Sequence, residues 1–464
     1  MYLTEKKEMK MDVVYDVVAN AAKTKFSDLP DSTIKIAKKF VLDTIGVAVA
    51  GSKASGCEEV VSYIKEMGGK QESTIIMFGG KVPNFHAAFV NSMMCHALDF
   101  DDTHEASIVH ANASVLPAAL ATAESVGGIS GKSFMVAYVL GIDFACRVGL
   151  AASSQQGWHH SWHHSSVCGY FGSTLASCKI LGLNERETLN ALGIAYSQVG
   201  GTLQCIMDTA LVKRMQPAFA ARAGVFSAML ARQGITGAKG IFEGEYGFFK
   251  MYEGGSGDVL RSELGRVFEI ERLNVKPYPC CHCTHGAITG VIELVKEHNI
   301  QPQDIERVEV ITSRYVHDLV GKAFEIRDNP QVDAQFSIPY TVAAAIIRGR
   351  FGIAELQESS IRDNQILSLA KKVKCIADES INTLLVPVTV RISLRDGVSY
   401  SKKVEILKGN PDNPTTEEEN TEKFNECVKF GRKPMSDERR EELAKLLLNL
   451  EAISDVQEII EYLA

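Results

Sequence analysis

Apolar residues recur at helical spacing along the first part of the chain. Between residues 12 and 264 they fall three or four positions apart, as at Val13 and Val17, and this spacing puts them on one face of an α-helix. One long apolar segment begins after Asp31, a residue that favours the start of a helix, and ends at Gly51, which favours its end. Several such segments in a row predict a large all-helical domain.

The pattern changes near residue 273. Segments 306–314 and 386–397 alternate apolar and polar residues and are rich in β-branched side chains, which predicts β-strands. The second segment ends in Asp396 and Gly397, a pair that favours a hairpin turn into another strand. These segments predict a smaller α+β domain.

A polar, proline-containing stretch follows Gly409 and predicts a loop, after which helical spacing returns. We therefore predict a mainly α protein in which residues 1–272 form the first part of the helical domain. Residues 273–408 form the α+β domain, and residues 409–464 return to pack on the helical domain. A chain of 464 residues with 45% apolar content has enough material for such cores.

Composition excludes several classes of protein. The net charge is −8, from 49 basic and 57 acidic residues that are mixed along the chain, so there is no basic stripe for nucleic acid. No stretch approaches the roughly 18 to 20 uninterrupted apolar residues of a membrane span, and the charged start does not resemble a signal peptide. We expect a cytoplasmic protein with no nucleic-acid or membrane partner, and scattered, odd-numbered cysteines that stay reduced.

Ionisable side chains are concentrated in residues 96–124, directly before an apolar helix. A cluster of this kind is costly to bury unless it is solvated or used in chemistry. Alternatively, Asp101, Asp102 and Thr103 only cap helices, and the histidines lie on the surface. The residues of this segment alone leave both interpretations open.

A second group of histidines occurs in a stretch rich in glycine, tryptophan and serine. The group consists of His159, His160, His163 and His164. Metal binding is one possibility, but adjacent histidines in a loop do not form a spaced ligand set such as H-E-x-x-H. Proton transfer by one of them fits better, because imidazole titrates near neutral pH.

Two further segments carry cations and thiols. Lys213 and Arg214 precede a small apolar helix, where such cations suit a carboxylate substrate, although a solvated helix start gives the same pattern. Lys276 opens a segment dense in cysteine and histidine that has no zinc-knuckle spacing. This segment lies at the predicted domain junction, and clefts between domains are favoured ligand sites.

In this order, the four segments resemble the MmgE/PrpD family over nearly the whole chain. That family includes 2-methylcitrate dehydratase, cis-aconitate decarboxylase and iminodisuccinate epimerase. The matching residues are Asp99, Phe100, Asp101, Asp102, Thr103 and His110; Trp162, His163, Ser165 and Gly169; Lys276, Pro277, Tyr278, Pro279 and Cys281; and residues 333–340.

The resemblance implies a large helical domain, a smaller α+β lid domain over 273–408, and a homodimer. It implies a lyase that uses acid/base catalysis without a cofactor or metal on a small di- or tricarboxylate. The implied catalytic residues are His110, His163, Asp99, Lys213 and Lys276. The implied substrate-binding residues are Thr103, Arg214, Tyr340 and Cys281.

Departures from the family pattern leave the substrate open. Ala111 follows His110 where the family often has proline, His164 replaces a proline, and Gln216 stands where many members have histidine. Three reaction types therefore stay open: dehydration, decarboxylation, and epimerisation of an amino or imino dicarboxylate. The sequence also does not decide whether His110 or His163 is the base. A metal-dependent hydrolase that uses the histidine clusters and a non-catalytic helical scaffold are further alternatives. We expect His159 and His282 to contribute little.

Overall fold

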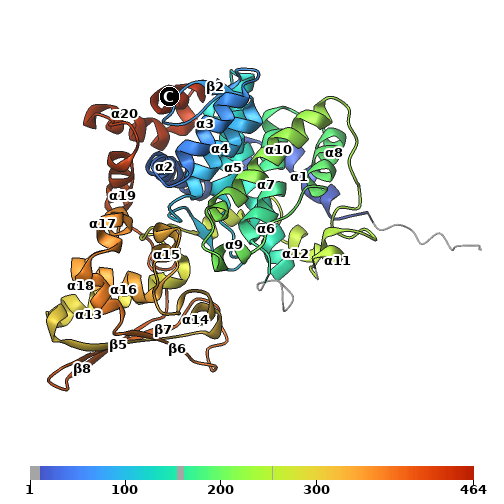
Figure 1. The fold of residues 1–464 in the computed structure, drawn as a ribbon. Coiled ribbons are helices and arrows are strands. Elements are labelled where there is room, and N and C mark those ends of the chain that lie inside the picture. The colour runs from blue at the N-terminus through green and yellow to red at the C-terminus, as the bar shows by residue number, and fades with distance from the viewer. Residues whose placement is uncertain (1–10, 154–160, 253) are drawn as a thin grey trace, which may run out of the picture.

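The computed structural model describes residues 11–153, 161–252 and 254–464, and it is mainly helical (Figure 1). This confirms the prediction of a mainly α protein. The longer helices of the first part are α1 (Val14–Lys23), α2 (Asp31–Gly51), α3 (Cys57–Met67), α4 (Asn84–His96), α5 (Asn112–Val126), α6 (Gly131–Ser153), α7 (His164–Ile180), α8 (Glu185–Tyr196) and α10 (Gln216–Arg232). Short helices α9 (Gln204–Met207), α11 (Phe248–Met251) and α12 (Gly257–Arg261) lie between and after them.

The last segment of the chain is also helical. It contains α19 (Glu417–Phe430), α20 (Asp437–Leu448) and α21 (Gln457–Leu463), and α19 and α20 pack against α2. Figure 1 shows this red segment beside the blue helix α2, so the last part of the chain returns to the helical unit. A capping box at Thr416 and Glu419 starts α19 after the polar loop.

A four-stranded sheet forms the other part of the molecule (Figure 1). Its order is β6 (Val373–Ala377), β5 (Ile305–Thr312), β7 (Val388–Leu394) and β8 (Ser399–Val404); β5 and β6 are parallel and the other pairs antiparallel. The β7–β8 turn contains Asp396 and Gly397, as the sequence predicts. The helices of this part are α13 (His285–His298), α14 (Arg314–Val320), α15 (Pro330–Gln335), α16 (Ile338–Arg348), α17 (Glu358–Ile361) and α18 (Asn364–Ala370).

Buried apolar residues form two large clusters. The first draws on residues 13–275 and on the returning segment 424–463, and the second draws on residues 280–407. Each cluster removes its own apolar surface from water, which is the main stabilising contribution to a folded unit. Whether the smaller unit moves as a lid stays a prediction.

Helices α6 and α7 approach closely through two glycines. A Cβ atom on Gly141 would lie 2.8 Å from the Gly172 carbonyl oxygen, and one on Gly172 would lie 2.5 Å from that of Gly141. Larger residues would force the helices apart. This contact places the start of α7, which follows His163, against the rest of the helical unit.

Among the described residues, α6 is long and apolar enough to cross a membrane, which the sequence interpretation did not expect. Its apolar stretch is 94% buried inside the protein, as in the core helix of a folded domain.

Candidate active site

A cavity lies between the two apolar clusters. From the helical part it is lined by Asp99, Thr103, Ile108, His110, Trp162, His163, His164, Ser165, Leu203, Ile206 and Lys213. From the smaller part it is lined by Cys281, His282, Cys283, Tyr315, Leu319, Phe336 and Leu385. A short pairing of β3 (Thr103–His104) with β4 (Leu273–Asn274) connects the two sides and brings Lys276 beside Asp99.

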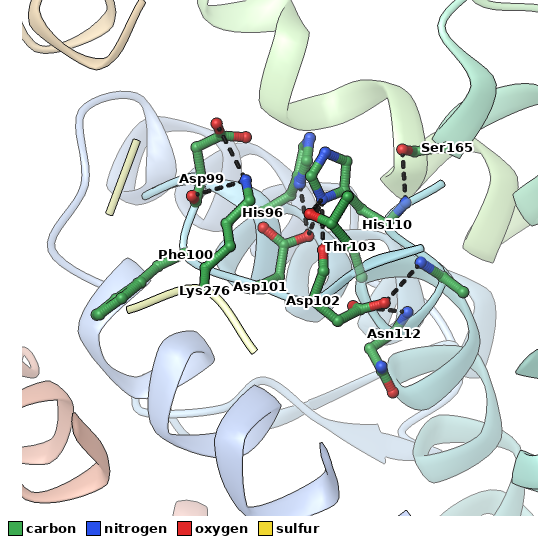
Figure 2. A network of polar contacts seen from close by, with 12 residues as sticks. His96, Asp99, Phe100, Asp101, Asp102, Thr103, His110, Asn112, Ser165 and Lys276 are labelled. Carbon is green, nitrogen blue, oxygen red and sulfur yellow. Dashed lines mark hydrogen bonds and ion pairs between the residues drawn. The ribbon is translucent and has the colours of Figure 1, made fainter. Parts of the chain in front are cut away.

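Asp99 pairs with both predicted lysines. Its carboxylate lies 2.6 Å from Lys213 Nζ. It also lies 3.3 Å from Lys276 Nζ, and Lys276 donates to the Asp99 carbonyl at 3.0 Å (Figure 2). All three side chains are buried. Burial alone would raise the pKa of Asp99, but the two ammonium groups outweigh it and hold that pKa well below its usual range. The trio therefore carries one excess positive charge inside the protein.

The backbone at Asp99 is in the left-handed region, with φ of 51°. A non-glycine residue adopts this conformation at some cost and keeps it only where its surroundings hold it. Here the two lysines bind both the side chain and the carbonyl of Asp99. The turn after α4 is therefore held by contacts from distant segments.

His96 belongs to the same network, although the sequence analysis did not select it. Lys213 Nζ lies 2.8 Å from His96 Nε2, and His96 Nδ1 lies 2.8 Å from the Asp101 carboxylate. Because an ammonium group can only donate, Nε2 accepts and Nδ1 carries the proton. Burial and then the charge of Lys213 lower the pKa of His96, so the ring is neutral at neutral pH. Its position in the histidine-rich stretch was the available signal.

His110 has a defined tautomer. Its Nδ1 lies 2.5 Å from the Asp102 carbonyl oxygen, which can only accept, so Nδ1 carries the proton and Nε2 carries the lone pair. Burial and the charge of Lys276 lower the pKa of this imidazole well below its usual value. Its backbone N–H donates to Ser165 Oγ at 2.9 Å (Figure 2). His110 is therefore a positioned, neutral base.

His163 immediately precedes α7, and its backbone N–H donates to the Gly201 carbonyl. Its Nδ1 is buried and has no hydrogen-bond partner among the described residues. Burial and the charge of Lys213 lower its pKa well below the usual value. The His96 ring lies 5.1 Å from that of His110 and 5.8 Å from that of His163, centre to centre. Three neutral imidazoles thus surround the Asp99 trio.

Asp102 and Asp101 have different surroundings. Asp102 accepts from the backbone N–H groups of Ala111 and Asn112 at 3.1 Å and caps the start of α5 (Figure 2). Of the two interpretations of this segment, helix capping therefore applies to Asp102. Asp101 is instead the partner of His96, and burial raises the pKa of both carboxyls.

Two predicted substrate contacts lie elsewhere. Tyr340 packs in the second apolar cluster near Phe324, and its hydroxyl donates to the Glu355 carbonyl. Arg214 is buried and donates to the Ser55 carbonyl at 2.8 Å. Neither is among the described residues that line the cavity. Arg214 adjoins Lys213 in one short helix, where neighbouring side chains point in different directions. A substrate-binding role for either residue stays a prediction.

The smaller unit lines the cavity with thiol, imidazole, phenol and apolar side chains. Cys281 lines the cavity from the smaller unit and Thr103 lines it from the helical unit, and hydrogen bonding to Cys283 holds the pKa of Cys281 below its usual range. His282 also lines it, 3.3 Å from the Glu105 carboxylate, and the expectation that it contributes little stays a prediction. His159 lies outside the described residues.

The donor atoms of His96, Asp101 and His110 lie within 4.8 Å of one another, close enough to consider a metal. However, Lys213 already occupies His96 Nε2, and Nδ1 of each histidine donates a hydrogen bond. A cation bound to His96 Nε2 would have to displace the ammonium group of Lys213 and separate it from this ring. This donor set suits proton transfer better than metal binding.

Comparisons with known proteins agree with this geometry. The model of the MmgE/PrpD N-terminal domain matches residues 16–259, and that of the MmgE/PrpD C-terminal domain matches residues 278–450. The chain is 30% identical to a cis-aconitate decarboxylase-like protein, oryM, from Aspergillus oryzae, over 94% of this chain and 93% of that protein. It is 28% identical to human cis-aconitate decarboxylase (93% and 90% covered) and 23% identical to 2-methylcitrate dehydratase from Escherichia coli O157:H7 (73% and 72%).

Proposed function

Because this chain belongs to the MmgE/PrpD family, we propose that it is a lyase acting on a small di- or tricarboxylate by acid/base catalysis without a cofactor. The observation that carries the proposal is the buried Asp99–Lys213–Lys276 trio beside neutral histidines in one cavity. Relatives named as cis-aconitate decarboxylases and 2-methylcitrate dehydratases support the same reaction class.

The excess positive charge of the trio attracts a carboxylate. When a bond breaks at the carbon beside a carboxylate, negative charge spreads onto its oxygens, and a fixed ammonium group stabilises that charge. Among the described residues that line the cavity, Lys213 is the one lysine or arginine, so it is the cation proposed for this purpose. Its contact with Asp99 keeps its ammonium group in place before substrate binds.

His110 Nε2 is the proton acceptor in this mechanism. In a dehydration it takes the proton from the carbon beside the carboxylate, and the resulting imidazolium or a second histidine protonates the departing hydroxyl group. In a decarboxylation CO2 leaves, the electron pair of the broken C–C bond stays on carbon, and a histidine that has taken up a proton from solvent delivers it to that carbon. His163, with its unpartnered Nδ1, is the second proton carrier.

An epimerase is the second candidate. Epimerisation removes a proton from one face of a carbon and returns one to the other, which needs two bases on separate elements. Here His110 precedes α5 and His163 precedes α7, and both line the cavity as neutral imidazoles.

A substrate screen tests the proposed function. We expect turnover of cis-aconitate, 2-methylcitrate or a related dicarboxylate, including amino and imino dicarboxylates, followed by mass spectrometry, with no added metal or nucleotide. Folded His110→Ala protein in the same mixtures is the control for contaminating activity. Activity that disappears with a chelator and returns with a metal ion would contradict the cofactor-free proposal and favour a metal-dependent enzyme.

We further propose that residues 273–408 act as a lid. Walls from both apolar clusters enclose the cavity, and closure would exclude water during reaction. A bound dicarboxylate should then slow hydrogen exchange in α14, which carries Tyr315 and Leu319. Unchanged exchange there with saturating ligand would contradict the lid. The homodimer and the cytoplasmic location stay predictions.

A further inference from the structure

A buried lysine of the returning segment contacts the Asp99–Asp101 turn and is not among the described residues that line the cavity. Lys423, on α19, donates to the Phe100 carbonyl at 2.8 Å, and its ammonium group lies 4.0 Å from the centre of the Phe100 ring. It also pairs with Asp43 of α2 at 2.7 Å. The Lys423 and Asp43 side chains are 7% and 5% exposed, so the pair is shielded from water.

Lys423 contacts the residue that lies between two carboxylates of the site. Phe100 separates Asp99, which holds the two lysines of the cavity, from Asp101, which holds His96 (Figure 2). Lys276 binds the carbonyl of Asp99 and Lys423 binds the next carbonyl. Two successive carbonyls of a left-handed turn are thus held by ammonium groups from different parts of the chain.

A buried charge needs a partner, and Lys423 has three contacts: a carboxylate, a carbonyl and an aromatic ring. Buried ion pairs add little net stability compared with apolar packing, although removing one partner is costly. Lys423 Nζ also satisfies a buried carbonyl of the turn, which an apolar side chain of similar volume could not do.

We propose that Lys423 is a positioning residue: it holds the Asp99–Asp101 turn so that Asp99 and Asp101 keep the lysines and His96 aligned. It acts through this turn and does not contact substrate. The inference rests on the proposed function, since it assigns the turn to the catalytic site. Misplacing a reacting group by about 1 Å typically costs about 10²-fold in rate.

The test compares Lys423→Met with Lys179→Met. Lys179, on α7, also donates to backbone carbonyls, at Ala21 and Thr24 near the end of α1, and is a matched lysine remote from the turn. With both variants folded, we expect Lys423→Met to lower kcat about 10- to 100-fold and Lys179→Met to leave it within about twofold. Lys423→Arg, which keeps a donor, should recover part of the loss.

Hydrogen exchange of residues 97–104 provides a readout that needs no substrate. It should become faster in Lys423→Met and stay unchanged in Lys179→Met. If no substrate is found, the proposed function fails, but the exchange result still decides the role of Lys423. If Lys423→Met does not fold, Lys423→Arg and Asp43→Asn replace it, with faster exchange of the same residues expected. Wild-type kcat and wild-type exchange in the folded variants would overturn the proposal.

Discussion

We expect His110→Ala and His163→Ala to lower kcat by about 10² to 10⁴-fold, because each removes a neutral imidazole from the cavity. The His110 tautomer makes Nε2 the proton acceptor. His110 lines the cavity, so its loss removes a base from the site. Steady-state kinetics on folded protein, checked by circular dichroism, measure the effect. The matched control is His86→Ala, which removes a buried histidine of α4 that does not line the cavity.

The pH profile of the wild-type protein provides a second check. Burial and the charge of Lys276 hold the pKa of His110 below 6.5, so the base stays neutral as the pH falls through that value. The acidic limb of kcat/KM should therefore lie below pH 6.5. Unfolded chains bind this proton more readily, near pH 6.5, so folding stability falls as the pH drops from there toward the lower folded pKa.

Wild-type turnover by folded His163→Ala would refute the assignment of that histidine.

Lys213→Ala and Lys276→Ala should impair both substrate binding and stability. Each leaves the Asp99 carboxylate paired with one ammonium group instead of two, and the loss of a buried hydrogen bond to a charged group typically costs about 1.5 to 3 kcal/mol. Loss of a carboxylate contact should also raise KM together with the fall in kcat. Urea unfolding and steady-state kinetics measure the two effects.

A second substitution separates charge balance from catalysis. Asp99→Asn in the Lys276→Ala background leaves Lys213 as a buried cation without its carboxylate partner, so we expect it to lower stability further without restoring activity. Arg214→Met is the control, because it removes a buried cation that contacts Ser55 and not the cavity. A Lys276→Ala variant with wild-type KM and wild-type stability would contradict the role proposed for the trio.

The sequence alone was sufficient to predict the secondary structure classes. Helical spacing and strand alternation are local properties, because each depends only on residues a few positions apart. The contact of Asp102 with the start of α5 is less local, because it joins residues nine and ten positions apart and depends on how the intervening loop folds. The candidates His110, His163, Lys213 and Lys276 came from chemically unusual segments together with family resemblance, and the structure places all four around one site.

Only the tertiary structure decided which neighbours of those residues take part. Tyr340 and Arg214 have suitable side chains but point into other surroundings, and His96 enters the network because the end of α4 meets Lys213. The tautomer of His110 depends on the backbone carbonyl of Asp102, eight positions earlier in the chain. Lys423 reaches Phe100 across 323 positions of the chain. Such contacts depend on how whole helices pack, and the local pattern of apolar and polar residues does not specify side-chain directions between distant elements.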